Sequence, residues 1–170
     1  LPIPDSVWSD YIDRVLALRV RPNTGVRAVY TAMHGVGWRP LQAILNAAGH
    51  TDIHPVPAQR DPDGDFPTVR FPNPEEPGAL DLAIAQAQDV GADLIVANDP
   101  DADRLAVALQ DREGRWTQLT GNEVGALLAE ELLAHGPAHP ARLVATTIVS
   151  SILLKKIATQ HGALCGETLT

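Results

Sequence analysis

Three aspartates alternate along a six-residue stretch, Asp-Pro-Asp-Ala-Asp-Arg, at positions 99–104. In an extended backbone every second side chain points the same way, so the carboxylates of Asp99, Asp101 and Asp103 can converge on one small volume. Their mutual repulsion opposes that convergence unless a cation is present. Three hard oxygen donors at one point suit Mg²⁺, which keeps the rest of its octahedron for water or a phosphate oxygen. The spacing therefore favours a magnesium site.

Other interpretations of the same acidic stretch remain open. It can be an acidic surface turn without a ligand, a non-catalytic module for a divalent cation, or part of a phosphatase with Asp99 or Asp101 as nucleophile. An EF-hand is disfavoured, because its loop needs Gly at position six and Glu at position twelve, where Arg104 and Gln110 stand. The stretch follows an apolar run, and ligands of α/β sheets gather at the carboxyl ends of strands. This location favours a ligand site over a simple turn.

A second acidic triplet, Asp61, Asp63 and Asp65, has the same spacing. It lies in a proline-rich connection, and no apolar strand leads directly into it. We interpret this triplet as a turn-rich surface loop, not as a metal site.

The elements around the first triplet predict an α/β sheet. Apolar runs at 92–97 and 105–109 flank it and are typical of buried strands. Another strand is predicted at 26–31, followed by the loop 33–37 and by a helix with Pro40 in its first turn that ends at Gly49. A short strand at 53–56 contains Pro55, which favours an edge position. Asn73 is predicted to cap a helix that runs to Gly91.

A turn at 111–114 predicts a domain boundary, with one domain over 1–113 and part of a second over 114–170. In the second part, Thr120 and Glu123 form a capping box for a helix at 122–135. A strand at 142–147, a helix at 152–161 and another strand from 162 follow. The order is βαβ-like on both sides of the boundary. We therefore predict a mixed, mostly parallel sheet flanked by helices, followed by a partial βαβ-type domain.

Composition limits the class of protein. The chain has 170 residues and a net charge of −8, without a basic stripe, which argues against a nucleic-acid partner. Cys165 is the lone cysteine, as is typical of a reducing cytosol, and we predict a cytoplasmic protein. No signal peptide and no apolar stretch of about 18 residues appears, so no membrane partner is expected. Because the chain begins Leu1-Pro2, we expect a fragment of a longer protein.

Several motifs together resemble the α-D-phosphohexomutase superfamily, the phosphoglucomutases and phosphomannomutases. The stretch 99–104 resembles their Mg²⁺-binding loop, and Thr31-Ala32-Met33-His34-Gly35-Val36-Gly37 resembles the glycine-rich loop after the first strand of their second domain. Phe-Pro-Thr-Val at 66–69, Pro-Asn-Pro-Glu-Glu at 72–76 and Thr-Gly-Asn-Glu at 120–123 match the family's usual order. Pro100 and the motif at 66–69 are similar to the phosphoglucomutase/phosphopentomutase branch.

The resemblance implies the second domain and the start of the third of a four-domain enzyme. Such an enzyme moves phosphate between C1 and C6 (or C5) of a sugar through a sugar bisphosphate, a phosphoserine and Mg²⁺. Its Ser-His-Asn-Pro motif is absent from this chain, so the serine, the rest of the third domain and the fourth domain are expected elsewhere. The fragment alone is then expected to fold but to lack turnover.

The resemblance also assigns residues. Asp99, Asp101 and Asp103 are the implied metal ligands, and Arg104 either stabilises phosphoryl charge or holds the loop by a salt bridge. His34 either approaches the phosphate or shapes its loop. Gly35 and Gly37 are candidate ligand-contacting positions in that loop, although a need for tight backbone explains them better.

Overall fold

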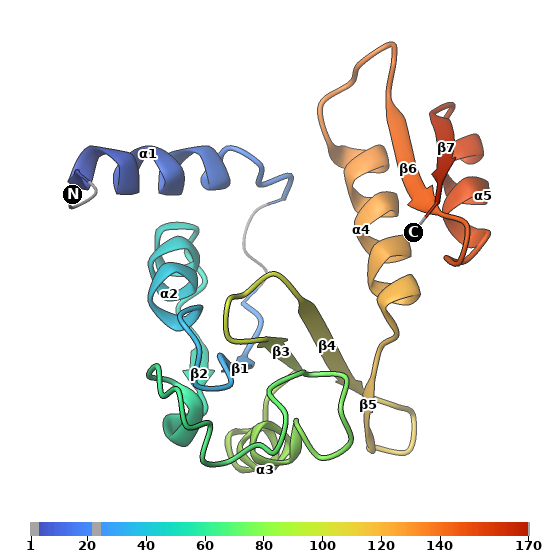
Figure 1. Cartoon of the computed structure of the whole chain (residues 1–170). Coiled ribbons are helices and arrows are strands. Elements are labelled where there is room, and N and C mark those ends of the chain that lie inside the picture. Colours follow the sequence, from blue (N-terminus) through green and yellow to red (C-terminus); the bar gives the residue numbers. More distant parts are fainter. Residues whose placement is uncertain (1–3, 22–24, 170) are drawn as a thin grey trace. The chain divides into compact units, whose positions relative to one another are not determined.

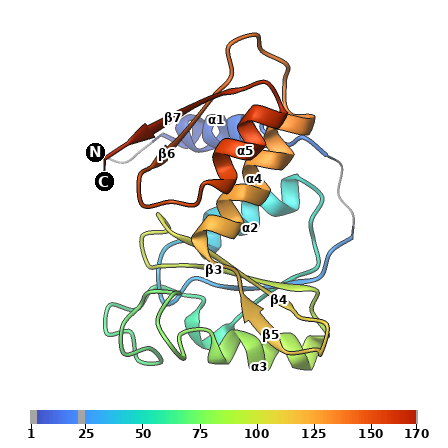
Figure 2. The ribbon, with the colours of Figure 1, turned by 90° about the vertical axis from the view of Figure 1, so that its right-hand side faces the viewer.

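The computed structural model describes residues 4–21 and 25–169 of the chain. It divides into two compact units, Leu1–Leu119 and Thr120–Thr170, which are described separately (Figures 1 and 2). Each unit combines strands with helices, as the sequence predicts.

The first unit contains a five-stranded mixed sheet. Its strands are β1 (Ala28–Thr31), β2 (Ile53–Pro55), β3 (Leu94–Asn98), β4 (Leu105–Gln110) and β5 (Trp116–Gln118), in the order β2-β1-β3-β4-β5. Strand β1 is parallel to β2 and β3, whereas β4 is antiparallel to β3 and β5. The predicted mixed sheet is confirmed, and β2, which contains Pro55, lies at an edge as expected.

The helices of this unit are α1 (Asp5–Leu16), α2 (Trp38–Ala47), the short 3₁₀ helix η1 (Pro57–Gln59) and α3 (Asp81–Val90). Helix α1 packs on α2. Helices α2 and α3 lie on opposite sides of the sheet in Figures 1 and 2. Ala83 and Ala87 of α3 are buried against Val29 and Ile95 of the central strands. Because these helix residues are small, α3 can pack closely on the parallel part of the sheet.

The predicted start of one helix was wrong. The helix expected from Asn73 begins only at Asp81, since Pro77 lacks a backbone N–H and Gly78 has a φ of +81°. Asn73 Oδ1 instead accepts a hydrogen bond from the N–H of Glu75 (3.1 Å) in a turn. The compact unit extends to Leu119, because β5 pairs with β4 and extends the sheet, and the domain boundary after residue 113 stays a prediction.

The second unit contains α4 (Gly121–His135), β6 (Leu143–Thr147), α5 (Leu153–Gln160) and β7 (Leu164–Thr168). Strands β6 and β7 are parallel and joined through α5, so this unit contains the expected βαβ arrangement. The predicted capping box is present, with Glu123 N–H donating to Thr120 Oγ1 and Thr120 N–H donating to Glu123 Oε2. Leu143 and Leu164 are opposite one another in the strand register and stay exposed.

Candidate metal centre

The acidic triplet lies in the loop that joins β3 to its antiparallel partner β4. Asp99, Asp101 and Asp103 each offer a carboxylate oxygen, and these atoms lie within 4.8 Å of one another. Asp99 is buried, whereas Asp101 and Asp103 are exposed. Within the described ranges this is the single group of three acidic, His or Cys side chains that converges in this way.

The convergence arises from a turn rather than from the extended backbone that the sequence reasoning assumed. Ala102 has a φ of +60°, and its N–H donates to the carbonyl of Asp99 at 3.0 Å. This reversal brings the third carboxylate back toward the first. The loop conformation, not strand alternation, makes the site compact.

The charges of the triplet favour a cation. The negative charge of Asp101, followed by a hydrogen bond with Asp99 and the charge of Asp99, raises the pKa of the Asp103 carboxyl above its usual value. A bound divalent cation would remove the repulsion that causes this shift. Three carboxylate oxygens are the donor type of Mg²⁺ sites, so these residues fit that ion.

Polar side chains hold the two ends of the loop 99–104, which we call the metal loop. The Tyr30 hydroxyl donates to Asn98 Oδ1 (2.9 Å), and Asn98 Nδ2 donates to the carbonyl of Arg104 (2.5 Å). The N–H of Arg104 donates to Asp99 Oδ1 (3.0 Å). Burial raises the pKa of Tyr30 to about 12, so its phenol stays a neutral donor over the physiological range. The two ends of the loop are therefore joined to each other and to β1.

Arg104 extends over the carboxylates. Its Nε lies 3.5 Å from Asp99 Oδ2 and 3.9 Å from Asp103 Oδ1, while its side chain is 56% exposed. The long distances and the exposure make a weak ion pair. The guanidinium is accessible to a ligand beside the triplet.

The glycine-rich loop after β1 contacts the metal loop directly. A Cβ added to Gly35 would lie 2.2 Å from the Cα and carbonyl oxygen of Pro100, and one added to Gly37 would lie 2.4 Å from the Tyr30 hydroxyl. The N–H of Val36 donates to the Pro100 carbonyl at 2.9 Å. The structure thus brings the two loops together; Gly35 packs tightly against backbone, and Gly37 packs against the side chain of Tyr30.

His34 is buried (4% exposed) beside the same loop. Its Nε2 lies 2.8 Å from Thr68 Oγ1, and its ring packs edge-on against Phe66. These contacts correspond to the loop-shaping alternative for His34. The side chains of Gln59 and Thr68, which share hydrogen bonds with this region, were not assigned a role from the sequence. Gln59 lies three residues beyond the predicted strand at 53–56 and belongs to no periodic or charged pattern, so no sequence signal identified it.

The second acidic triplet has other partners. Asp61 pairs with Arg60 at 2.7 Å, and the N–H of Asp63 donates to the carbonyl of His34 at 2.9 Å. The described structure does not bring its three carboxylates together. Its loop instead packs against the glycine-rich loop.

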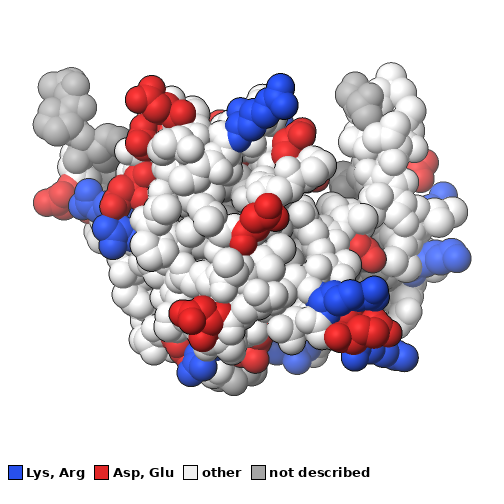
Figure 3. Space-filling model, turned by 90° about the horizontal axis from the view of Figure 1, so that it is seen from below, with Lys and Arg blue, Asp and Glu red and all other residues white. Residues whose placement is uncertain are grey.

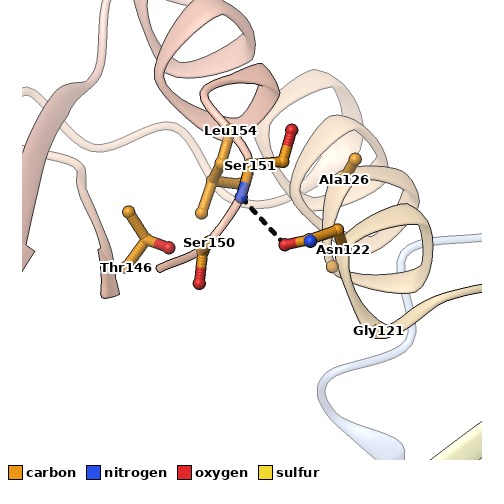
Figure 4. Close-up of a pocket in the computed structure, with 8 residues that line it drawn as sticks. Gly121, Asn122, Ala126, Thr146, Ser150, Ser151 and Leu154 are labelled. Atoms are coloured by element: carbon orange, nitrogen blue, oxygen red, sulfur yellow. Dashed lines mark hydrogen bonds between the residues drawn. The ribbon is translucent and has the colours of Figure 1, made fainter. Parts of the chain in front are cut away.

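The second unit holds a small cavity of about 120 Å³ between the start of α4 and the loop before α5 (Figure 4). Its lining includes Asn122, Thr146, Ser150 and Ser151. Asn122 Oδ1 accepts a hydrogen bond from the N–H of Ser151 (2.9 Å), and Ser151 Oγ accepts from the N–H of Leu153 (3.2 Å). Ser151 thus bonds to the N–H of Leu153, the first residue of α5, whereas the N-cap position itself is Ile152, which makes no side-chain cap hydrogen bond.

Charged side chains of both signs lie on the surface of the described residues. On the face shown in Figure 3, Lys and Arg are interspersed with Asp and Glu, without a continuous basic stripe there. Helices long and apolar enough to cross a membrane are absent from the described ranges.

Comparison with known proteins identifies the family to which this chain belongs. Residues 9–114 match the family described as "Phosphoglucomutase/phosphomannomutase, alpha/beta/alpha domain II", and the chain belongs to this family. A phosphoglucomutase/phosphomannomutase family protein from Burkholderia thailandensis has the same fold, with a TM-score of 0.73 and 24% identity over 95% of this chain and 33% of its own. The fold is that of the α-D-phosphohexomutase superfamily.

Two individual relatives match most of this chain. The chain is 48% identical over 166 residues to a Haemophilus influenzae protein named "Probable phosphomannomutase", covering 98% of this chain and 34% of that protein. It is 45% identical over 157 residues to the Saccharomyces cerevisiae phosphoribomutase, covering 84% of this chain and 25% of that protein. The chain therefore spans between a quarter and about a third of the length of these relatives.

Proposed function

We propose that this chain supplies the metal-binding second domain and the start of the third domain of a phosphosugar mutase. The observation that carries the proposal is the convergence of Asp99, Asp101 and Asp103 within 4.8 Å on a loop fixed to β1 and β3. The family match and the mutase names of the relatives support this class of enzyme. In the whole protein, phosphate would move between C1 and C6, or C5, of a sugar by way of a sugar bisphosphate and a phosphoserine outside this chain.

The residues at this site have separate proposed roles. Asp99, Asp101 and Asp103 would hold Mg²⁺, which when bound supplies Lewis-acid stabilisation of phosphoryl charge. Arg104, beside the triplet and 56% exposed, would present its planar guanidinium to the phosphoryl oxygens. Tyr30 and Asn98 keep the loop closed, and the glycine-rich loop supports its outer turn.

The metal assignment is tested by titrating the chain with Mg²⁺ and with Mn²⁺ as a paramagnetic probe, observed by ¹H–¹⁵N NMR. We expect the amides of 99–104 to shift and broaden, and Asp101→Asn to weaken binding at least tenfold. The matched control is Asp63→Asn in the second triplet, which should bind as the wild type does. If the metal perturbs 61–65 instead, the assigned site is wrong.

The reaction is tested at two levels. In the complete mutase, Asp101→Asn should lower turnover at least about a hundredfold, because charge stabilisation provides much of phosphoryl-transfer catalysis. The isolated chain, mixed with Mg²⁺, glucose 1-phosphate and catalytic glucose 1,6-bisphosphate, should form no glucose 6-phosphate. Product formation that Asp101→Asn abolishes would show that the phosphate carrier lies within this chain, and a trapped phospho-aspartate would identify a phosphatase-type nucleophile.

A further inference from the structure

A buried glutamine lies at the centre of a hydrogen-bond network beside the glycine-rich loop. Gln59 ends the 3₁₀ helix η1 and is 1% exposed. Its Oε1 accepts from Thr31 Oγ1 (2.6 Å), and its Nε2 donates to Thr68 Oγ1 (2.9 Å). Both ends of the amide are therefore satisfied, which fixes its orientation. A buried polar group in a satisfied network holds its neighbours in one arrangement.

The same network holds the two residues that begin the glycine-rich loop. Thr31 Oγ1 accepts a hydrogen bond from the N–H of Met33 (3.0 Å), and the backbone carbonyl of Gln59 accepts one from the N–H of His34 (3.0 Å). Thr68 Oγ1 is 2.8 Å from His34 Nε2. Met33 and His34 have φ values of +46° and +63°, a conformation that non-glycine residues keep only where the surroundings impose it. The hydrogen bonds of Gln59, Thr31 and Thr68 are these surroundings.

The next residues of the loop touch the metal loop. Gly35 packs so closely on Pro100 that a Cβ would lie 2.2 Å from its backbone, and the N–H of Val36 donates to the Pro100 carbonyl. Pro100 stands between the metal-loop residues Asp99 and Asp101. A shift at His34 is therefore passed on through backbone contacts, which cannot yield as a flexible side chain would.

We propose that Gln59 is a positioning residue for the metal centre, acting through Thr31, Thr68 and His34 on the glycine-rich loop and through that loop on Pro100. The inference rests on the proposed function, because it assigns a supporting role at the same site. It also assigns His34 a positioning role. Gln59 itself need not touch metal or substrate.

The test compares the buried Gln59 with the half-buried Gln86. Gln59→Leu keeps the side-chain volume but removes both hydrogen bonds, and Gln86→Leu is the matched control. Gln86 Nε2 donates to the carbonyl of Pro55 (2.9 Å), away from the glycine-rich loop. Mn²⁺ affinity of the whole chain is measured by electron paramagnetic resonance, and thermal unfolding is recorded for both variants. We expect both to lower the unfolding midpoint, but only Gln59→Leu to weaken Mn²⁺ binding, by about tenfold.

A second readout does not depend on the metal. Hydrogen exchange at the Val36 amide reports its bond to Pro100, and we expect its protection to fall in Gln59→Leu and to persist in Gln86→Leu. If Gln59→Leu does not fold, Thr31→Val removes the central hydroxyl and Thr31→Ser restores it. Thr31→Val should then reproduce both effects, and Thr31→Ser should behave as the wild type.

The outcomes separate this inference from the proposed function. Wild-type Mn²⁺ binding elsewhere than at the triplet overturns the proposed function, while Val36 protection still decides the positioning of the loop. Unchanged Mn²⁺ affinity and unchanged Val36 protection in folded Gln59→Leu overturn the inference. Equal losses in Gln59→Leu and Gln86→Leu also overturn it, because they indicate general destabilisation.

Discussion

Replacing Gly35 by alanine perturbs the contact between the two loops with a single methyl group. The added Cβ would lie 2.2 Å from the Pro100 Cα and carbonyl oxygen, roughly 1.2 Å inside the 3.4 Å at which ordinary contact begins. Overpacking of this kind costs about 1–3 kcal/mol in the free energy of unfolding. Gly→Ala elsewhere gains about 0.4–1 kcal/mol by restricting the unfolded chain. The steric cost prevails, so we expect a net loss of about 1–2 kcal/mol.

The same substitution should affect metal binding more strongly than it affects the free energy of unfolding. Relief of the clash moves the backbone of Pro100 by roughly 1 Å, whereas metal–ligand distances tolerate only about 0.2 Å. We therefore expect Gly35→Ala to weaken Mg²⁺ binding about 10- to 100-fold, measured by isothermal titration calorimetry. Gly64→Ala is the matched control, since a Cβ at Gly64 meets nothing within 4 Å. Wild-type affinity in a folded Gly35→Ala variant would refute the coupling of the two loops.

Two further predictions concern hydrogen bonds at the ends of elements. Tyr30→Phe removes the donor to Asn98, so we expect a loss of about 1 kcal/mol in urea unfolding at neutral pH. Burial raises the pKa of Tyr30 from 10.0 to about 12, so the folded chain keeps the phenolic proton to a higher pH than the unfolded chain does. The stability of the wild type should therefore fall between pH 10 and 12 more steeply than that of Tyr30→Phe. Equal slopes for the two proteins would contradict this prediction. In the second unit, the N–H of Thr120 holds the pKa of Glu123 below its usual value, so the contribution of Glu123 is present above about pH 4.5 and lost as the pH falls through the lowered pKa. The difference in unfolding midpoint between the wild type and Glu123→Gln should accordingly shrink on acidification, and a difference that is equal at pH 7 and about pH 3 would contradict the capping role.

Local chemistry made much of the fold predictable. Apolar runs gave β3 and β4, Pro55 placed β2 at an edge, and the Thr120–Glu123 pair marked the start of α4. The start of α3 was wrong because Asn73-Pro74-Glu75-Glu76 has the composition of a helix start, but Pro77 and Gly78 interrupt it. Strand β5 was missed because three residues carry too little period-2 signal, and only pairing with β4 defines it.

The candidate site was predictable as a set of residues but not as a geometry. Types and spacing identified Asp99, Asp101 and Asp103, yet their convergence depends on the positive φ of Ala102, which sequence spacing does not reveal. Tyr30 and Gln59 were missed for a related reason. Each acts on the loops through contacts between segments distant in the sequence. Such contacts follow from strand order, and an isolated residue carries no pattern for them.

The strand order also explains why the glycines are needed. Strands β1 and β3 are parallel neighbours, so the loops that follow them leave the same edge of the sheet. Neighbouring strands are only about 4.8 Å apart, which leaves no room for a side chain between two backbones that start side by side. Gly35 occupies this gap, and the N–H of Val36 uses it to hold Pro100. Strand β4 then returns antiparallel to β3, so the metal loop is a closed turn with both ends fixed in the sheet. A carboxylate triplet held in this way has its donors placed before a cation arrives, which lowers the entropic cost of binding.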